Sequence, residues 1–219
     1  RAVVRTVEHT APGQVLGILD GFHGLITDRT RPLLPASVSG LLPRGGTILG
    51  TSNRDNPFEF DGLIDGQRVV GDVSDRVLET IRRHHLDALV VVGGDGTLAI
   101  ADQIAQQGVA VVGVPKTIDN DLSCTDQTFG FDTAVGICSE AIDRLHTTAE
   151  AHHRVMVVEV MGRNAGWIAL HAGLASGGDI ILIPEIPFRY EAIAAAVRAR
   201  CTRGKPFSIV VVAEGAAPE

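Results

Sequence analysis

A glycine-rich segment that can bind a phosphate group follows an apolar run near the middle of the chain. The run at residues 90–92 leads into residues 93–97, whose sequence is G-G-D-G-T. Glycines let backbone N–H groups approach an anion closely, and the start of a following helix adds a partial positive charge. Asp95 can hold a Mg²⁺ ion, directly or through water, and Thr97 can cap the helix or bind phosphate. The alternative is an ordinary strand–turn–helix connection in which Asp95 is a capping residue.

A second polar segment, residues 115–121, follows the next apolar run and has the sequence P-K-T-I-D-N-D. In an extended backbone, residues two apart point the same way, so Thr117, Asp119 and Asp121 would share one face, opposite Lys116. Two carboxylates beside a cation suggest one general base and one contact to substrate or metal. Taken alone, the segment is equally compatible with a polar loop that contains Asx turns.

The third segment, residues 158–167, reads V-E-V-M-G-R-N-A-G-W. We expect a strand to end here and a helix to start at about Asn164. Gly162 allows a close approach of the backbone, and Arg163 lies where a planar donor fork can grip a phosphate. A surface arginine beside a helix cap is the other interpretation.

The elements that must position these segments follow from the apolar pattern. Most apolar runs of strand length are continuous rather than alternating, which is typical of parallel strands covered on both faces. Helical patterns lie between several of them, so the sequence predicts a doubly wound α/β fold with ligands at the carboxyl ends of parallel strands. The expected strands are residues 15–19, 88–92, 109–114, 155–160, 180–183 and 208–213, and the expected helices are residues 97–107, 133–149, 165–175 and 192–203.

Two stretches bear on the domain organisation. Residues 50–71 are rich in Asn, Asp, Gly and Pro, and we interpret them as a loop or a short hairpin. A long helical pattern begins near Phe131 and could carry the chain from one sheet to another. We therefore expect two lobes, residues 1–131 and residues 132–219, with the site in the cleft between them.

Composition and charge narrow the class of partner. The 219 residues carry a formal net charge of -7, which argues against nucleic acid or an acidic membrane, because either would require a basic face. The three cysteines form no C-x-x-C motif, so we expect reduced thiols and a cytoplasmic protein rather than disulfides or a zinc site. No apolar run is long enough for a membrane span, and no signal peptide opens the chain. The chain starts without Met in a helical pattern and stops just past a strand pattern, so both ends look cut.

Together the three polar segments resemble the three signature stretches of phosphofructokinases, in the order in which that family carries them. Four lesser matches agree with this resemblance, so that it covers essentially the whole chain. They are residues 19–25 (L-D-G-F-H-G-L), 45–50 (G-G-T-I-L-G), 184–188 (P-E-I-P-F) and 213–216 (A-E-G-A). NAD kinases and lipid kinases share the G-G-D-G-T stretch, but the other two signature stretches favour phosphofructokinase.

The resemblance implies transfer of a phosphoryl group to the 1-hydroxyl of fructose 6-phosphate, a reaction of glycolysis. By position, Asp119 resembles the catalytic base that takes the hydroxyl proton, and Thr117 resembles its partner in the substrate loop. Asp121 would lie near the metal and the sugar, and Asp95 resembles the aspartate associated with Mg²⁺. Phosphoryl transfer needs positioning and charge neutralisation more than covalent chemistry, and these groups would supply both.

The resemblance also implies a sugar-phosphate lobe and an oligomer. Met161, Gly162, Arg163 and Glu214 resemble the contacts to fructose 6-phosphate, and Arg163 would also neutralise charge during catalysis. Arg154 resembles the arginine that reaches the sugar phosphate of a neighbouring subunit. The active site would then be shared between subunits of a homo-oligomer.

The donor lobe of the family binds either ATP or pyrophosphate. Gly94, Asp95, Gly96 and Thr97 would contact the donor phosphates. Pyrophosphate users typically carry an aspartate at the position of Gly96, where it would occupy the space of the α-phosphate of a nucleotide and repel its charge.

Two further positions bear on the donor. Pyrophosphate users resemble this chain in having a lysine at Lys116, where many ATP users have glycine. After residues 50–52 the family often has arginine, whereas this chain has Asn53 and then Arg54, which we expect among the donor contacts. A side chain that sterically excludes ATP constrains the donor more strongly than an optional ion pair does. We therefore give Gly96 more weight than Lys116 in the choice of donor. We therefore expect ATP as the co-substrate, with pyrophosphate as the alternative.

Other departures from the family pattern carry expectations of their own. The glycine-rich loop that opens the family and the ligands beyond the A-E-G-A strand are missing, so we expect this chain alone to be inactive or nearly so. A truncated polypeptide that binds without turnover is the non-enzymatic alternative. Pro35 and His146 lie where bacterial allosteric members carry effector-site arginines, which argues against classical effector regulation.

Overall fold

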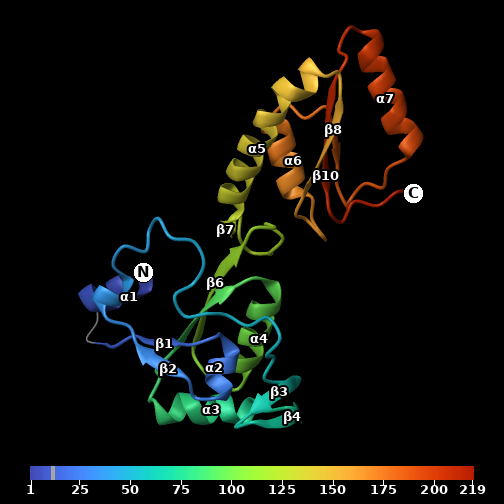
Figure 1. Ribbon diagram of the computed structural model, residues 1–219. Helices are drawn as coiled ribbons and strands as arrows, with labels where there is room; N and C mark the ends of the chain where they lie inside the picture. Colours follow the sequence, from blue (N-terminus) through green and yellow to red (C-terminus); the bar gives the residue numbers. More distant parts are fainter. Residues whose placement is uncertain (11–12) are drawn as a thin grey trace. The chain divides into compact units, whose positions relative to one another are not determined.

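The computed structural model describes residues 1–10 and 13–219 and places them in two compact units. Figure 1 shows the elements of each. The first unit comprises Arg1–Val91 and Ala99–Val112, and the second comprises Val92–Leu98 and Gly113–Glu219. These two units are defined by their internal contacts and not by the ligands they bind. The expected division after Phe131 into a donor lobe and a sugar-phosphate lobe therefore stays a prediction.

The first unit is built from short strands and helices. It contains α1 (Ala2–Thr10), β1 (Leu16–Ile18), α2 (Phe22–Ile26), β2 (Thr30–Pro32), the 3₁₀ helix η1 (Pro35–Val38), β3 (Phe60–Ile64), β4 (Gln67–Gly71) and α3 (Ser74–Arg83). Strand β5 (Leu89–Gly93), helix α4 (Asp95–Gln106) and strand β6 (Val111–Thr117) each have residues in both units.

The parallel strand expected at residues 15–19 is instead antiparallel. Strand β1 pairs with β2 in a two-stranded sheet, with Leu16 opposite Pro32 and Ile18 opposite Thr30. The connection between them holds only the five-residue helix α2. A parallel return requires a crossover of a dozen or more residues, so this connection is too short for one.

Residues 50–71 contain the short hairpin that the sequence suggests as one interpretation. Strands β3 and β4 pair antiparallel around the turn Asp65–Gly66, where φ is 53° and 80°. Positive φ at both central residues is the geometry that a two-residue hairpin turn favours, and Asp-Gly supports it. The amphipathic helix α3 that follows was not among the expected helices, although Val77 and Ile81 are spaced one turn apart and both buried.

The core of the first unit is aromatic and aliphatic. It is centred on Phe60 and Ile104, which are 1% and 0% exposed. The remaining buried members come from α2, β3, α3, β5 and the residue just before α3, and they are Phe22, Leu25, Ile26, Ile64, Val73, Val77, Ile81 and Leu89.

The second unit contains the parallel sheet that the sequence predicts. Its elements are β7 (Phe129–Gly130), α5 (Phe131–Ala151), β8 (Val155–Val160), α6 (Trp167–Ala175), β9 (Ile180–Leu182), α7 (Tyr190–Thr202) and β10 (Ser208–Ala213). The strand order is β8-β10-β9, and β10 is parallel to both neighbours. Strands β5, β6 and β7 form a further three-stranded sheet, in which β6 and β7 are parallel.

Helices α5 and α6 cover one side of the β8-β10-β9 sheet, and α7 lies on the other (Figure 1). Between them, α5, α6 and β10 bury a core of Ile142, Ala149, Ala169, Ala172, Ile209, Val211 and Ala213. The expectation of strands covered on both faces fits β10 but not β8, where Val155 and Val157 are 46% and 67% exposed. The reason is position, because β10 is central and β8 is an edge strand.

None of the helices in the described residues is both long enough and apolar enough to span a bilayer.

Candidate active site

The G-G-D-G-T segment forms a tight turn from β5 into the first turn of α4. Gly93 packs against Thr97 so closely that a Cβ there would lie 2.5 Å from the Thr97 Cβ, which excludes any side chain. Asp95 is the first residue of α4 and is exposed. The free N–H groups and the dipole of a helix start favour an anion at this point.

Gly94 and Gly96 have different surroundings. A Cβ at Gly94 would lie 3.5 Å from the Thr117 Cβ, so this turn and the end of β6 are in contact. A Cβ at Gly96 would meet no heavy atom within 4 Å. Open space beside a helix start leaves room for a phosphate chain.

The end of β6 presents Asp119 in a hydrogen-bonded setting. Thr117 Oγ1 donates to Asp119 Oδ2 at 3.4 Å and accepts from the Asp119 backbone N–H at 3.3 Å. Partial burial raises the pKa of the Asp119 carboxyl above its ordinary value, and the negative charges of Asp121 and Glu214 raise it further, against the bond from Thr117. A carboxylate with a raised pKa is a better proton acceptor, which suits a general base.

The backbone around Asp119 differs from the expected extended strand. Strand β6 ends at Thr117, and Asn120 has φ 54°, in the left-handed region. The premise that Asp119 and Asp121 share a face because of strand alternation is therefore wrong. The two carboxylates are nevertheless close enough for Asp121 to shift the pKa of Asp119.

The segment after β8 is held by backbone contacts with the segment after β10. Gly162 has φ 141°, and its carbonyl accepts the N–H of Gly215 at 3.1 Å. A Cβ at Gly215 would lie 1.9 Å from the Arg163 carbonyl oxygen, so the two backbones touch. The Glu214 N–H donates to the Val160 carbonyl at 2.9 Å. These contacts bring Arg163 and Glu214 to the same edge of the sheet.

The side chains of this edge are open to solvent. Met161 is 56% exposed, and Arg163 and Glu214 are also exposed. Within the described residues, Arg163 makes no salt bridge, so its guanidinium is available to an anion. Helix α6 begins at Trp167 rather than at about Asn164, and Glu185 Oε1 accepts the N–H of Gly166 at 2.9 Å just before it.

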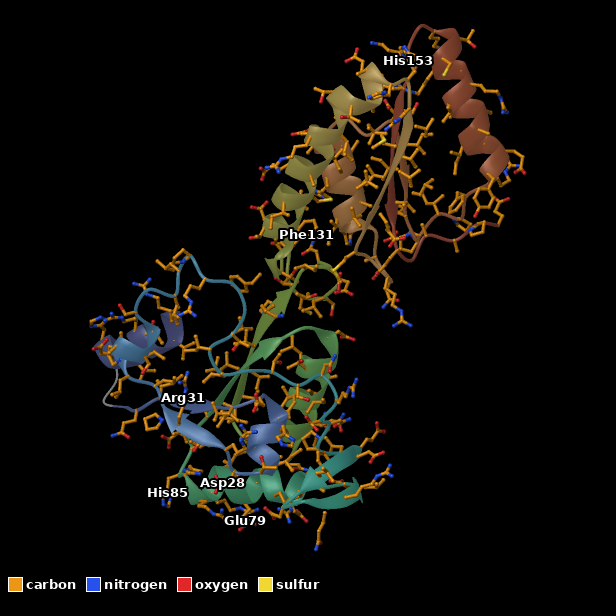
Figure 2. The ribbon with its side chains drawn as sticks, in the orientation of Figure 1. Asp28, Arg31, Glu79, His85, Phe131 and His153 are labelled. Atoms are coloured by element: carbon orange, nitrogen blue, oxygen red, sulfur yellow. The ribbon has the colours of Figure 1, made fainter. Side chains whose placement is uncertain are left out.

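Two of the expected site residues, Arg154 and Arg54, lie outside the three polar segments. Arg154 directly precedes β8, whereas Arg163 follows it, and the six residues of that strand separate them by about 20 Å. Figure 2 shows the neighbouring His153 at the end of α5 opposite Phe131. Arg154 therefore cannot act together with Arg163 of the same chain at one phosphate.

Arg54 belongs to the first unit, in a loop packed against the turn after β1. The Asp20 N–H donates to the Leu49 carbonyl at 2.8 Å, and His23 Nδ1 lies 3.5 Å from Asp55 Oδ1. Arg54 itself is exposed, and its backbone N–H donates to Ser52 Oγ at 3.3 Å. These contacts define the shape of the loop, and the role of Arg54 at the donor stays a prediction.

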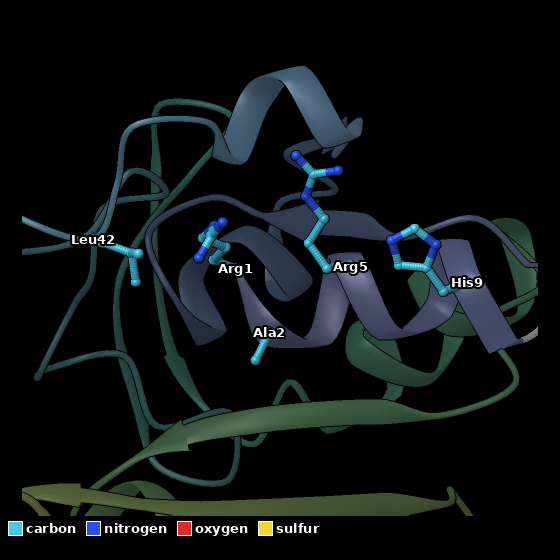
Figure 3. A pocket seen from close by; sticks show the side chains of 5 residues that line it. All are labelled: Arg1, Ala2, Arg5, His9 and Leu42. Atoms are coloured by element: carbon cyan, nitrogen blue, oxygen red, sulfur yellow. The ribbon is translucent and has the colours of Figure 1, made fainter.

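A cavity of about 420 Å³ opens beside α1 in the first unit. It is lined by Arg1, Ala2, Arg5, His9 and Leu42 (Figure 3). No residue of the three polar segments lines this cavity.

The residues around Asp95 fit a Mg²⁺ ion shared with a phosphate ligand. The described residues contain no group of three or more His, Cys, Asp or Glu side chains that could cage a metal by themselves. Mg²⁺ is usually bound by one or two carboxylates together with substrate phosphates and water. A single exposed Asp95 at a helix start is compatible with that mode.

Comparison with known proteins accounts for this arrangement of segments. The model of the family described as Phosphofructokinase matches residues 1–219. The chain belongs to the phosphofructokinase family. The G-G-D-G-T stretch alone left open a relationship to NAD kinases or lipid kinases. The family match over the whole chain excludes that alternative.

Individual phosphofructokinases show the degree of similarity. The chain is 53% identical to ATP-dependent 6-phosphofructokinase 2 of Clostridium perfringens, over 100% of the chain and 60% of that relative. It is 50% identical to the pyrophosphate–fructose 6-phosphate 1-phosphotransferase of Amycolatopsis methanolica, over 100% of the chain and 61% of that relative. The T-state crystal structure of Pichia pastoris phosphofructokinase matches with a TM-score of 0.86 and 31% identity, over 99% of this chain and 24% of that one.

The phosphofructokinase match confirms the predicted α/β fold class. The chain spans about 60% of the length of the curated relatives it matches.

Sequence reasoning on this phosphofructokinase chain missed three residues that shape the site. Glu185 and Gly215 support the Arg163 segment, and Asn120 carries the left-handed turn beside Asp119. For Asn120 a signal existed, because Asn between two Asp residues favours a left-handed turn. The contacts of Glu185 and Gly215 join distant segments, and no local pattern indicates them.

Proposed function

We propose that the full-length protein transfers the γ-phosphoryl group of ATP to the 1-hydroxyl of fructose 6-phosphate in the cytoplasm, giving ADP and fructose 1,6-bisphosphate. One observation carries this proposal: the segment of Asp119, a carboxylate with a raised pKa, lies against the glycine-rich turn at the start of α4. A base beside an anion site is what phosphoryl transfer to an alcohol requires.

In the proposed reaction, the Asp119 carboxylate accepts the proton of the 1-hydroxyl as that oxygen attacks the γ-phosphorus, and the bond to the β–γ bridging oxygen breaks. Thr117 orients the carboxylate through the hydrogen bond to Oδ2. Burial and the nearby charges of Asp121 and Glu214 keep Asp119 more basic than an ordinary aspartate. The carboxylate can then take the proton directly, without a covalent intermediate.

The donor would lie against the start of α4. Gly94, Gly96 and Thr97 would line the phosphates, and Lys116 and Arg54 would offset their charge. When bound, Mg²⁺ neutralises charge on the transferred phosphoryl group. Asp95 would hold it from the first turn of α4.

The sugar phosphate would be held by the segments after β8 and β10. Arg163 would pair with the 6-phosphate, and Met161, Gly162, Glu214 and Asp121 would contact the sugar. The separation of Arg154 from Arg163 along β8 supports a role for Arg154 at the site of a neighbouring subunit. We therefore propose a homo-oligomer with a shared active site.

The choice of donor rests on Gly96 rather than on overall similarity, because relatives named for ATP and for pyrophosphate are both at least 50% identical to the chain. The open space beside Gly96 favours ATP, since its α-phosphate has room there. Lys116 suits either donor.

A donor comparison tests the proposal. Formation of fructose 1,6-bisphosphate by the full-length protein is followed in a coupled assay with MgATP and, separately, with pyrophosphate. We expect the larger kcat/KM with MgATP. A larger value with pyrophosphate would overturn the choice of donor, and no product with either would overturn the proposed reaction.

A further inference from the structure

The loop between β6 and β7 is closed by the side chain of Asn120. Its Oδ1 accepts hydrogen bonds from the Thr128 backbone N–H at 2.8 Å and from Thr128 Oγ1 at 3.4 Å. Thr128 is 3% exposed, and the two residues after it pair with the end of β6. The Asn120 amide therefore ties the start of the loop to its buried end.

The same residue carries an unusual backbone conformation. Asn120 has φ 54°, and it lies between Asp119 and Asp121. Single left-handed residues are uncommon outside glycine, although asparagine tolerates them better than most. A residue in this conformation turns the chain sharply, so it sets where the carboxylates on either side of it lie.

From this geometry we infer that Asn120 is a positioning residue of the active site, which fixes Asp119 against the acceptor hydroxyl through its hydrogen bonds to Thr128. This inference rests on the proposed function. It adds a residue that touches neither substrate and acts through the loop that carries the base.

The side chain at this position must meet three requirements, and asparagine meets all of them. It must tolerate a positive φ, it must accept two hydrogen bonds from a buried threonine, and it must add no charge next to Asp119 and Asp121. Glycine meets the first and third requirements and lacks the acceptor. Aspartate meets the first two, because its carboxylate can accept both bonds, but it adds a negative charge.

The test uses the full-length protein, with kcat and both KM values measured for each variant. Asn120→Gly removes the acceptor without backbone strain, and we expect kcat to fall about 30-fold, since a misplacement of about 1 Å can cost about 10²-fold. The KM for MgATP should stay within about twofold, because residues 93–97 lie on another segment. Ser123→Ala, in an exposed part of the same loop, is the matched control and should leave kcat unchanged.

Further variants separate positioning from general loss of structure. Asn120→Asp keeps the acceptor but adds a charge, so its kcat should fall less than that of Asn120→Gly. Thr128→Val removes one of the two donors and should cause a smaller loss of kcat than Asn120→Gly. The double variant Asn120→Gly/Thr128→Val should be no slower than Asn120→Gly, since both changes break the same contact.

Each outcome has a distinct meaning. A kcat of Asn120→Gly within about threefold of the wild type, or additive losses in the double variant, would overturn the positioning role. A parallel rise in the KM for MgATP would also overturn it, because it would indicate a general distortion. If the wild-type protein makes no fructose 1,6-bisphosphate, the proposed function fails before the role of Asn120 is in question.

Discussion

Gly215→Ala tests how the Arg163 segment is positioned. The added Cβ would lie 1.9 Å from the Arg163 carbonyl oxygen and 2.7 Å from its carbonyl carbon, distances that real Cβ atoms essentially never show. The obstacle is backbone, which cannot rotate out of the way as a side chain can. One of the two segments must therefore move by about 1 Å, because packed interiors transmit such strain rather than absorb it.

The expected consequence is a loss of sugar-phosphate affinity. A shift of about 1 Å in a binding group can cost about 10²-fold, so we expect the KM for fructose 6-phosphate to rise between about 10-fold and 100-fold. The KM for MgATP should be unchanged, because the three atoms nearest to the added Cβ all belong to the backbone of Arg163 and none to the G-G-D-G-T turn. Initial rates of the full-length protein over a grid of both substrates give the two constants separately.

Gly136→Ala is the matched control, since a Cβ there would meet nothing within 4 Å in helix α5. Alanine is a better helix former than glycine by about 1 kcal/mol, so this variant should be slightly more stable and fully active. If Gly215→Ala bound fructose 6-phosphate within about twofold of the wild type, Gly215 would not hold the sugar-phosphate contacts in place.

Four further predictions concern the full-length protein. Because Asp119 acts as a base, kcat should fall as the pH drops through its raised pKa. Glu214→Gln removes a negative charge that raises this pKa, so the fall in kcat should move to lower pH. A pH–rate profile that did not move would contradict the role of Asp119 as the base. Gly96→Asp should fold normally but lose most ATP turnover, and ATP turnover that survived would refute the steric reasoning. Arg163→Ala should lower the affinity for fructose 6-phosphate in a direct binding titration. Unchanged affinity would show that Arg163 does not bind the sugar phosphate. Subunits with Arg154→Ala and with Asp119→Asn, each inactive alone, should recover activity in mixed oligomers, and failure to recover it would argue against a shared site.

The parts of the fold that depend on local pattern could be predicted from the sequence. The runs at residues 155–160 and 208–213 became β8 and β10, because continuous apolar residues suit a parallel sheet. Strand β1 was assigned to the wrong kind of sheet, since its antiparallel pairing depends on the short connection to β2 and not on its own residues. Helix α3 was missed because charged residues surround its narrow apolar stripe.

The candidate site was predictable to a similar extent. Asp95, Asp119 and Arg163 could be identified because each follows the end of an apolar run, and because glycines adjoin Asp95 and Arg163. The hydrogen bond of Asn120 with Thr128 closes a loop, and the contact of Gly215 with Arg163 joins segments about 50 residues apart. Contacts of this kind arise only when the chain closes, so periodicity cannot reveal them.

The most direct measurement is a single-turnover experiment on the full-length protein with γ-³²P-labelled ATP, Mg²⁺ and fructose 6-phosphate. The wild-type protein should transfer the label to fructose 1,6-bisphosphate. Asp119→Asn should bind both substrates with nearly unchanged affinity and transfer the label about 10²–10⁴ times more slowly, the usual effect of removing a general base. Transfer by Asp119→Asn within a few-fold of the wild-type rate would show that Asp119 is not the base, and absence of labelled product with the wild-type protein would contradict the proposed reaction itself.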